Sequence, residues 1–520
     1  MDKSVTKAWG QYEKGKDYKR RIGLYDTVRR NERFYRGDQW YGGPADLPRP
    51  IFNVIRRIID YLVCTVVSGN ISIRYTDESL PYAESRAQAE QLRRGVEVLT
   101  GNASYRWESE HMDTLTYRLM LDAAISGDGV LYCSWDPAKR SSPLSPGDLR
   151  TQLIDNVNLF VADVNRADLQ SQDYIILAGR QSVESLRREA KANGVSESEL
   201  RKILPDSDRI SQSGDHADYE LEGCDEEKAT YIIKFWREEG RVCFEKSTRL
   251  CVIDRQVTNL RLYPVAYFNW FPTKNSFHGT APVSGLIPNQ KFINRAYAMV
   301  MKHMTDTAFS KVIYDKTKIP EWSNEVGEAI AAVGGGNISD AVSVVGVGQL
   351  QSGYLELIER AIADTKEMMG ATETALGNTD PTNTSAILAM QEAARVPLTQ
   401  VRVAFRQCIE DLAAIWADML CVCYSDGRRI PVLANGELAI RAADFSALHD
   451  SLIRAHVEIG NVPEYSISTT QGMLDRLLTG GYIGADDYLE LLPDGLTLKR
   501  GELAKRVEAH AAESEVSANG

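Results

Sequence analysis

The histidine and acidic residues in the middle of the chain are the first candidates for chemistry. His303 and Asp306 stand three residues apart, so a helix would place them one turn apart on the same face. Such a pair can act as a general base with its orienting carboxylate. A polar face at a helix end is the simpler interpretation, because no nucleophile accompanies the pair. An enzyme site assembled from scattered residues, for example Asp128, His278 and His303, is kept as an alternative.

Cysteine and motif patterns give no catalytic or metal site. The eight cysteines include no CxxC pair and no histidine cluster beside them, which disfavours structural zinc. Most lie in apolar runs such as LYCSW and MLCVCY, a pattern typical of reduced, buried thiols. Asp486 and Asp487 are adjacent and therefore do not share a helix face. No P-loop, nucleophile elbow, zinc-protease or kinase motif is present. We therefore expect no enzymatic activity, no metal and no cofactor.

The run NERFYRGDQW, residues 31–40, mixes charges with aromatics. Arginines neutralise phosphates and aromatic rings stack on bases, so a nucleic-acid-binding module on the basic N-terminal helix is a second alternative. Composition favours a different interpretation, in which the aromatics are buried at a helix end and the arginines face water. The residues concerned are Arg30, Arg33, Arg36, Phe34, Tyr35 and Trp40.

Charge and hydropathy bound the possible partners. The 520 residues carry a formal net charge of -12, which excludes a strongly basic nucleic-acid-binding protein as a whole. The charge is uneven, because residues 1–40 hold 11 Lys/Arg against 6 Asp/Glu, whereas residues 441–520 hold 7 against 13. The N-terminal segment has no apolar core of the kind a signal peptide needs, and no run of about 18 apolar residues predicts a membrane span.

The elements that must position these residues follow from periodicity. An amphipathic helix is expected over 3–36, broken near Gly15 and Gly23, followed by a helix from Ile51 to about Ser68 and a strand at 71–76. Helices near 82–99 and 104–126 precede an α+β region of short strands at 129–270, with a helix at 182–193 and an exposed loop at 208–227.

The second half of the chain is richer in helix. We expect a helix at 285–305, an insert at 306–350 with two strands and a short helix, and a helix at 353–371. A long helix at 386–424 contains Pro397, which predicts a kink. Acidic helices are expected over 447–513 and a disordered tail after them. The fold class predicted is therefore α+β and helix-rich.

Four segments in order resemble tailed-bacteriophage portal proteins. NERFYRGDQW followed by PRPIFNVIRRIIDYLV resembles the family's opening box and its next helix. HGTAPVSGLIPNQKFINRAYAM (278–299) resembles a family helix, with Gln290 and Asn294 at the matching places. NTSAILAMQEA (383–393) resembles the segment after the family's tunnel loop, although Thr384-Ser385 replaces the usual Ser-Gly. The stretch 130–270 matches only in character.

The resemblance implies a ring of about twelve subunits built from wing, stem, clip and crown. On this chain the wing would be residues 1–282, the first stem helix 283–305, the clip 306–350 and the second stem helix 351–371. A tunnel loop would follow at 372–385, then the long kinked helix with a returning wing segment at 386–446, the crown at 447–513 and a disordered tail at 514–520.

The resemblance also implies a function and a set of partners. The ring would occupy one capsid vertex of the virion, conduct double-stranded DNA during packaging and ejection, and assemble in the host bacterial cytoplasm without a membrane. Partners would be the terminase large subunit, the major capsid or scaffold protein and a head-completion adaptor. The tunnel-loop residues facing DNA would be Gly377, Asn378, Thr379, Asp380, Pro381, Thr382, Asn383 and Thr384. The stem and subunit-interface residues would be Gln290, Asn294, Leu357, Ile358, Ala361 and Ile362.

Overall fold

The computed structural model divides the chain into two units. It describes residues 3–40, 47–142, 145–206, 227–307, 311–323, 330–334, 337–345, 353–371, 396–424, 427–434, 437–459, 464–484 and 488. The first unit contains residues 1–67 and 74–456, and the second contains residues 68–73 and 457–520. The predicted tunnel loop, 372–385, and the tail predicted to be disordered, 514–520, lie outside the described residues.

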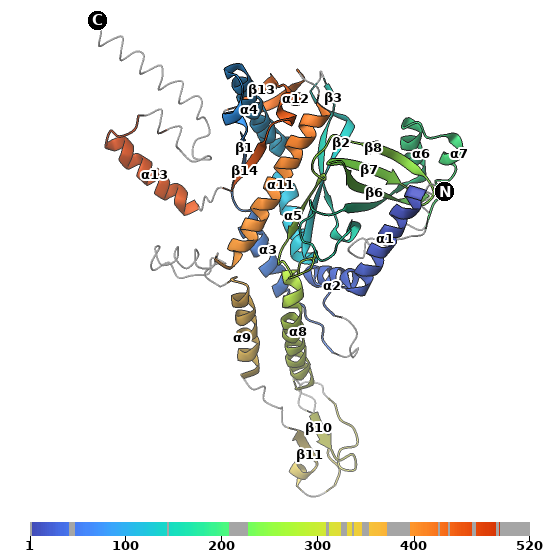
Figure 1. The fold of residues 1–520 in the computed structure, drawn as a ribbon. Helices are drawn as coiled ribbons and strands as arrows, with labels where there is room; N and C mark the ends of the chain where they lie inside the picture. The colour runs from blue at the N-terminus through green and yellow to red at the C-terminus, as the bar shows by residue number, and fades with distance from the viewer. Residues whose placement is uncertain are drawn as a thin grey trace. The chain divides into compact units, whose positions relative to one another are not determined.

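The N-terminal helix expected over 3–36 is broken at one of the two predicted glycines. Helix α1 spans Lys3–Arg21 and α2 spans Leu24–Arg36 (Figure 1). The break falls at Gly23, whose φ of 66° is a left-handed conformation that glycine adopts without strain. Gly15 stays inside α1, where a Cβ would lie 2.7 Å from Phe160 Cδ1. Gly15 is therefore needed for close packing and not for a turn.

Three helices form the core beside α2. Helix α3 spans Val54–Val67 and buries the apolar face that the sequence predicted, including Ile58 and Leu62. Helix α4 spans Arg86–Ser109 and α5 spans Met112–Ser126, with a one-turn helix, η1, at Leu80–Tyr82 before them. The expected break near residue 100 is wrong. Gly101 continues α4 because it lies against a strand, where a Cβ would be 2.9 Å from Val432 Cβ.

Two antiparallel sheets form the α+β part. The three-stranded sheet has the order β3–β2–β9, and the five-stranded sheet has the order β4–β5–β6–β7–β8. Helix α1 packs on the five-stranded sheet through a cluster that contains Trp9, Tyr12, Phe160 and Ile176. The strands are β2 Asp128–Ser142, β3 Ser145–Ile154, β4 Leu159–Val161, β5 Tyr174–Ser182, β6 Lys228–Glu238, β7 Arg241–Ser247, β8 Val252–Val257 and β9 Val265–Asn269. The short helices of this region are η2 Asn156–Asn158, α6 Val183–Ala192 and α7 Glu197–Leu200.

Helices α8 and α9 pack against each other, and a two-stranded sheet separates them in the chain. Helix α8 spans Pro282–Thr307 and α9 spans Gly353–Met368. Strands β10, Lys311–Tyr314, and β11, Val342–Val345, pair antiparallel beyond the ends of the two helices (Figure 1). A turn of 3-10 helix, η4, occupies Ile338–Asp340. The short helix expected at 323–333 falls mainly outside the described residues, and residues 330–334 contain no helix.

The C-terminal half differs from the sequence expectation at Pro397 and again after residue 447. Pro397 lies in a 3-10 turn, η5 Val396–Leu398, that directly precedes helix α11, Thr399–Cys423, so the described helix begins after the proline and has no kink there. Residues 386–395 of the expected long helix lie outside the described residues. A hairpin of β12, Arg429–Ala434, and β13, Glu437–Ala442, then packs on α4.

The expectation of helices alone after residue 447 is wrong. Helix α12 spans only Phe445–His449. Strand β14, Ile453–Ile459, follows it and pairs with β1, Ile71–Asp77. Apolar and polar residues alternate in β14, which the helical interpretation overlooked. In the second unit, α13 spans Glu464–Thr479. The mixture of helices and antiparallel sheets confirms the predicted α+β class.

Candidate functional site at the base of helix α8

The carboxylate of Asp128 is a buried hub at the point where the chain enters α8. Its Oδ1 accepts hydrogen bonds from the backbone N–H of Gly279 at 2.7 Å and from Asn269 Nδ2 at 2.9 Å. Its Oδ2 accepts from His278 Nδ1 at 2.7 Å and from Asn156 Nδ2 at 3.2 Å. Four donors satisfy the buried carboxylate, so its hydrogen bonds offset the free-energy cost of burying the charge. It ties the segment that precedes α8 to β2, β9 and η2.

A buried lysine fastens α1 to the same region. Lys19 is 2% exposed, and its Nζ donates to the carbonyl oxygens of Asn156 at 2.8 Å, Val157 at 3.0 Å and Leu159 at 2.5 Å. Burial lowers the pKa of Lys19 to about 7, although Asp128 and Asp155 act in the opposite direction. The basic face expected for α1 therefore turns one of its lysines into the protein interior.

A second buried network lies two turns farther along α8. Gln290 and Asn294 are 1% and 3% exposed. Asn294 Nδ2 donates to Gln39 Oε1 at 2.8 Å, and Gln290 Nε2 donates to Asn294 Oδ1 at 2.9 Å and to the carbonyl of Phe52 at 2.7 Å. Gln39 Nε2 in turn reaches Asn53 Oδ1 at 3.0 Å. Four amide side chains from three segments thus bond to one another.

The same amides satisfy the first turn of α3. Gln290 Oε1 accepts from the backbone N–H groups of Val54 at 3.0 Å and Ile55 at 3.2 Å. Asn53 Oδ1 accepts from the N–H of Arg56 at 3.1 Å, as an N-cap residue does. The beginning of a helix leaves N–H groups without intrahelical partners, so a side chain of α8 completes α3. These contacts make α2, α3 and α8 one unit of packing.

The box at residues 31–40 is placed by this network. Phe34 is buried, whereas Tyr35 and Trp40 are only half-buried, so the expectation that all three are buried is wrong for two of them. Both half-buried rings use their polar ends: Tyr35 Oη donates to Asp60 at 2.6 Å, and Trp40 Nε1 donates to the carbonyl of Pro50 at 2.9 Å. A polar tip kept near water is typical of tyrosine and tryptophan.

The arginines of the box are largely engaged within the chain. Arg33 pairs with Asp38 at 2.7 Å, and Arg36 pairs with Glu32 one helical turn away. Arg30 is exposed. Both ion pairs are partly exposed and therefore weak, so nucleic-acid binding by this segment stays an alternative prediction.

The predicted stem and interface residues divide into buried and exposed groups. Gln290 and Asn294 lie inside the chain, and their amides are occupied there. On α9, Ile358 is buried, Leu357 is 52% exposed, and Ala361 and Ile362 are half-buried. Contact of any of these residues with a neighbouring subunit stays a prediction. The predicted tunnel-loop residues, Gly377 to Thr384, lie outside the described residues.

The enzyme alternative is brought together only in part. Asp128 and His278 are hydrogen-bonded, but His303 lies 21 residues after the first residue of α8, about 31 Å along the helix axis. Hydroxyls of Ser126 and Ser284 line a pocket beside His278, yet in the described part of the chain neither bonds to the imidazole. A base without a bonded nucleophile does not make a hydrolase site.

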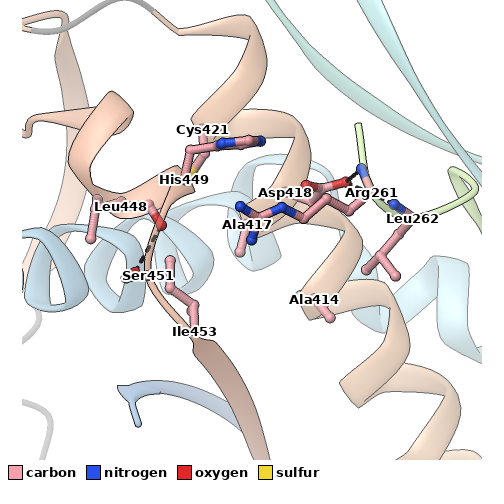
Figure 2. Close-up of a pocket in the computed structure, with 10 residues that line it drawn as sticks. All are labelled: Arg261, Leu262, Ala414, Ala417, Asp418, Cys421, Leu448, His449, Ser451 and Ile453. Carbon is pink, nitrogen blue, oxygen red and sulfur yellow. Dashed lines mark hydrogen bonds between the residues drawn. The ribbon is translucent and has the colours of Figure 1, made fainter. Parts of the chain in front are cut away.

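A second pocket, between α11 and α12, also lacks an activated group. It measures about 180 Å³ and is lined by Asp418, Cys421, His449 and Arg261 above an apolar floor (Figure 2). Asp418 accepts from the backbone N–H groups of Arg261 at 2.9 Å and Leu262 at 3.0 Å, so it holds a loop. Burial raises the pKa of the Cys421 thiol to about 12, which leaves it protonated and unreactive at neutral pH.

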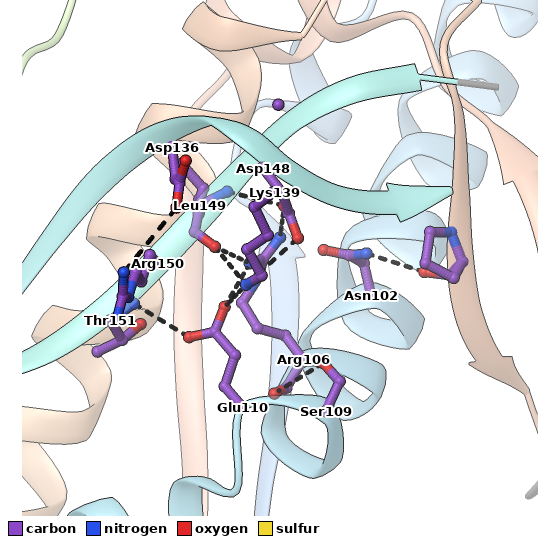
Figure 3. Close-up of polar contacts among 12 residues, drawn as sticks. Asn102, Arg106, Ser109, Glu110, Asp136, Lys139, Asp148, Leu149, Arg150 and Thr151 are labelled. Atoms are coloured by element: carbon purple, nitrogen blue, oxygen red, sulfur yellow. Dashed lines mark hydrogen bonds and ion pairs between the residues drawn. The ribbon is translucent and has the colours of Figure 1, made fainter. Parts of the chain in front are cut away.

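A buried ion network centred on Arg106 has a structural role. Arg106 on α4 bonds to Glu110 and Asp148, each at 2.8 Å, and Lys139 bonds to Glu110 at 2.7 Å (Figure 3). Tyr424 Oη donates to Asp148 at 2.6 Å. These groups fasten the β2–β3 hairpin to α4 and to the end of α11. Nothing in the described residues gathers three or more potential ligands into a metal site, and no described helix has the length and apolar character of a membrane span.

Sequence reasoning missed the amides that hold the site. Gln39 stands in the box that drew attention for its charges and aromatics, and Asn53 stands in a proline-rich turn. Asn156 and Lys19 have no motif around them. The usable signal for Asn53 was its position just before an apolar helix, where asparagine is a preferred N-cap. Gln39 gave no such signal, because Asn294, which donates to it, lies 255 residues away in the chain.

Comparisons with known proteins bear on this site directly. Residues 264–437, which run from β9 through α8, α9 and α11 to β13, match the model of the phage P22-like portal protein family. A comparison with curated proteins finds no match. Among solved structures, a chain from the virion of a native gene transfer agent (GTA) particle is similar, with 10% identity, a TM-score of 0.39, and coverage of 90% of this chain and 92% of that one. The family match over residues 264–437 confirms the resemblance to phage portal proteins.

Proposed function

We propose that this chain is a portal subunit that forms, with copies of itself, a ring at one vertex of a phage capsid. The observation that carries the proposal is the segment matched by the family. There, α8 and α9 pack together, and two buried networks fix the base of α8 to the body of the chain. A helix held in this way keeps its direction under load, which suits the wall of a conduit for moving DNA.

Exposed apolar side chains on both helices support assembly. Large apolar patches on a soluble protein usually mark an interface with another molecule. A ring needs a heterologous contact, in which one face of α8 and α9 meets a different face of the next copy. The exposed apolar residues on the two helices are Phe292, Met299, Met301, Met304, Tyr354, Leu355, Leu357 and Met368.

The parts of the portal are assigned as follows. We place the wing at residues 1–282 with a returning segment that ends at 446, the stem at α8 and α9, and the clip between them with β10 and β11. The tunnel loop keeps its assignment to 372–385. The second structural unit begins its longer segment at residue 457, so we move the start of the crown from 447 to 457.

The partners follow from that role. Double-stranded DNA passes through the ring during packaging and ejection, and the clip side contacts the terminase large subunit and later a head-completion adaptor. The wing faces the major capsid or scaffold protein. ATP hydrolysis is assigned to the terminase, since this sequence has no P-loop. The assembled protein is a component of the virion, put together in the host cytoplasm.

Electron microscopy and mass measurement of the purified protein test the proposal. We expect rings of about twelve to thirteen copies with an axial hole. Leu357→Asp should shift the protein to smaller species, because it places a charge in the expected contact. Val257→Asp is the matched control, since Val257 is also exposed, at 67%, but lies on β8. A monomer or dimer in the unmodified protein would overturn the ring.

A further inference from the structure

A pocket of about 270 Å³ lies between the α1–α2 elbow and the segment that leads into α8. The residues around it carry hydroxyl groups to an unusual degree. Tyr18 and Thr27 line it from the elbow, and Thr280, Ser284 and His278 line it from the α8 side. Portal function as proposed above does not use this pocket.

His278 is the most buried of the polar side chains that line the pocket. It is 7% exposed, and its Nδ1 is committed to Asp128. Its other ring nitrogen, Nε2, has no hydrogen-bond partner within the described ranges of the chain. With Nδ1 committed to the carboxylate, Nε2 is the ring nitrogen that is left for a ligand. Four hydrogen bonds already satisfy the carboxylate of Asp128, which is not among the residues that line the pocket.

Three of the hydroxyls are available as donors. Asn31, which is fully buried, donates from Nδ2 to Ser284 Oγ at 2.8 Å, so the serine's own proton is free to point elsewhere. The Thr27 hydroxyl makes no side-chain hydrogen bond to any described residue. Burial raises the pKa of Tyr18, so its hydroxyl stays protonated at neutral pH. These groups can donate to one oxygen-rich ligand.

The electrostatic surroundings favour a negative charge. The pocket lies at the N-terminus of α8, a helix of 26 residues, where the helix dipole is positive. Arg21 stacks on the Tyr18 ring at 5.6 Å, and exposed Lys274 follows Thr273, which also lines the pocket. Buried Lys19 lies beyond Asp128 and offsets part of its charge.

We propose that this pocket binds a tetrahedral oxyanion of the phosphate class through His278, Thr27, Tyr18 and Ser284. The ligand is either free phosphate or a phosphate group of the DNA backbone, which present the same oxygens. Asn31, the first residue of the 31–40 box, then orients Ser284, which contacts the ligand.

Titration of the full-length protein with inorganic phosphate in a calorimeter tests the site. His278→Asn keeps a side-chain nitrogen near the position of Nδ1 for Asp128 and removes Nε2, so affinity should fall about tenfold. Thr27→Val keeps shape and removes one donor, and should weaken binding about threefold. His111→Asn is the control, since His111 is exposed and its φ of 52° is one that asparagine tolerates.

The outcomes separate cleanly. Saturable binding that both pocket variants weaken, and that His111→Asn leaves unchanged, supports the site. No saturable binding, or pocket variants that match the control, overturns it. Thr27→Val decides the matter if His278→Asn fails to fold. A DNA duplex that displaces phosphate in a His278-dependent manner assigns the pocket to backbone phosphates, and a duplex that does not displace it assigns the pocket to free phosphate.

Discussion

Asn294 on α8 donates a hydrogen bond to Gln39 at 2.8 Å, across 255 residues of chain. Both side chains are buried, and Gln39 also bonds to the carbonyl of Phe34 and to Asn53. The bond joins the N-terminal box to the family-matched segment. A motion of α8 relative to this box would have to break buried hydrogen bonds between amide side chains. We therefore expect the base of the helix to be rigid.

Removal of the Asn294 amide should destabilise the protein by about 1–3 kcal/mol. Asn294→Ala leaves Gln39 Oε1 without its donor and removes an acceptor from Gln290 Nε2. Urea denaturation measures the free energy of unfolding. Arg295→Ala is the control, because Arg295 is the next residue and is exposed. Equal stability of the two variants would show that the network contributes nothing.

A double-mutant cycle should show that Gln39 and Asn294 act together. We expect Gln39→Leu with Asn294→Leu to cost less than the sum of the single changes, since each single change leaves the other member of the Gln39–Asn294 bond unsatisfied and the double change removes both members. The same denaturation measurements supply the coupling free energy. Simple additivity within about 0.5 kcal/mol would contradict the direct bond.

Trp40→Ala and Phe34→Ala should differ in cost. Phe34 is 6% exposed, so its removal should cost about 3–5 kcal/mol. Trp40 is half-buried and makes one bond to Pro50, so we expect about 1–3 kcal/mol. Thermal unfolding of both variants provides the comparison. A larger loss for Trp40→Ala would mean that Trp40 is covered by something beyond the described residues.

Local patterns predicted much of the fold. The apolar face of α3, the limits of α6 and the helix–insert–helix order around α8 and α9 all follow from spacing. The failures have physical causes. Separate helices were expected near 82–99 and 104–126, but the missing side chain of Gly101 lets α4 continue and pack closely on β12. β14 finds its partner in β1, nearly 400 residues earlier, which no local pattern reveals.

The candidate site was predicted less well than the fold. Gln290 and Asn294 were singled out through the resemblance, yet their partners Gln39 and Asn53 were not. Asp128 and His278 were named only as an example of scattered residues. Buried amides carry no charge and have no periodicity, and their role depends on hydrogen bonds that form when distant segments meet.

Loss of the Arg106 guanidinium should be among the most damaging single changes. Burial alone would raise the pKa of Asp148, but Arg106, with Tyr424 and Lys139, holds it below its usual value. Arg106→Met leaves two buried carboxylates with fewer partners, which should cost about 3–5 kcal/mol. Arg94→Met on the same helix breaks only an exposed pair with Glu90 and should cost under about 1 kcal/mol. Chemical denaturation compares the two, and similar costs would contradict the buried network.

Asp122 should make stability depend on pH. Burial, with the nearby charges of Asp155 and Glu32, raises the pKa of Asp122 from 3.8 to about 7. Between these values the folded protein holds a proton that the unfolded chain has released, so the contribution of Asp122 to stability falls as pH rises from 4 to 7. Asp122→Asn cannot ionise. It should therefore match the unmodified protein near pH 4 and exceed its stability by on the order of 2–4 kcal/mol at pH 8.

Asp26→Asn, at an exposed position on α2, should show no such pH-dependent gain. Urea denaturation at several pH values decides the matter, and a difference between Asp122→Asn and the unmodified protein that stays constant from pH 4 to pH 8 would rule out titration of this carboxyl.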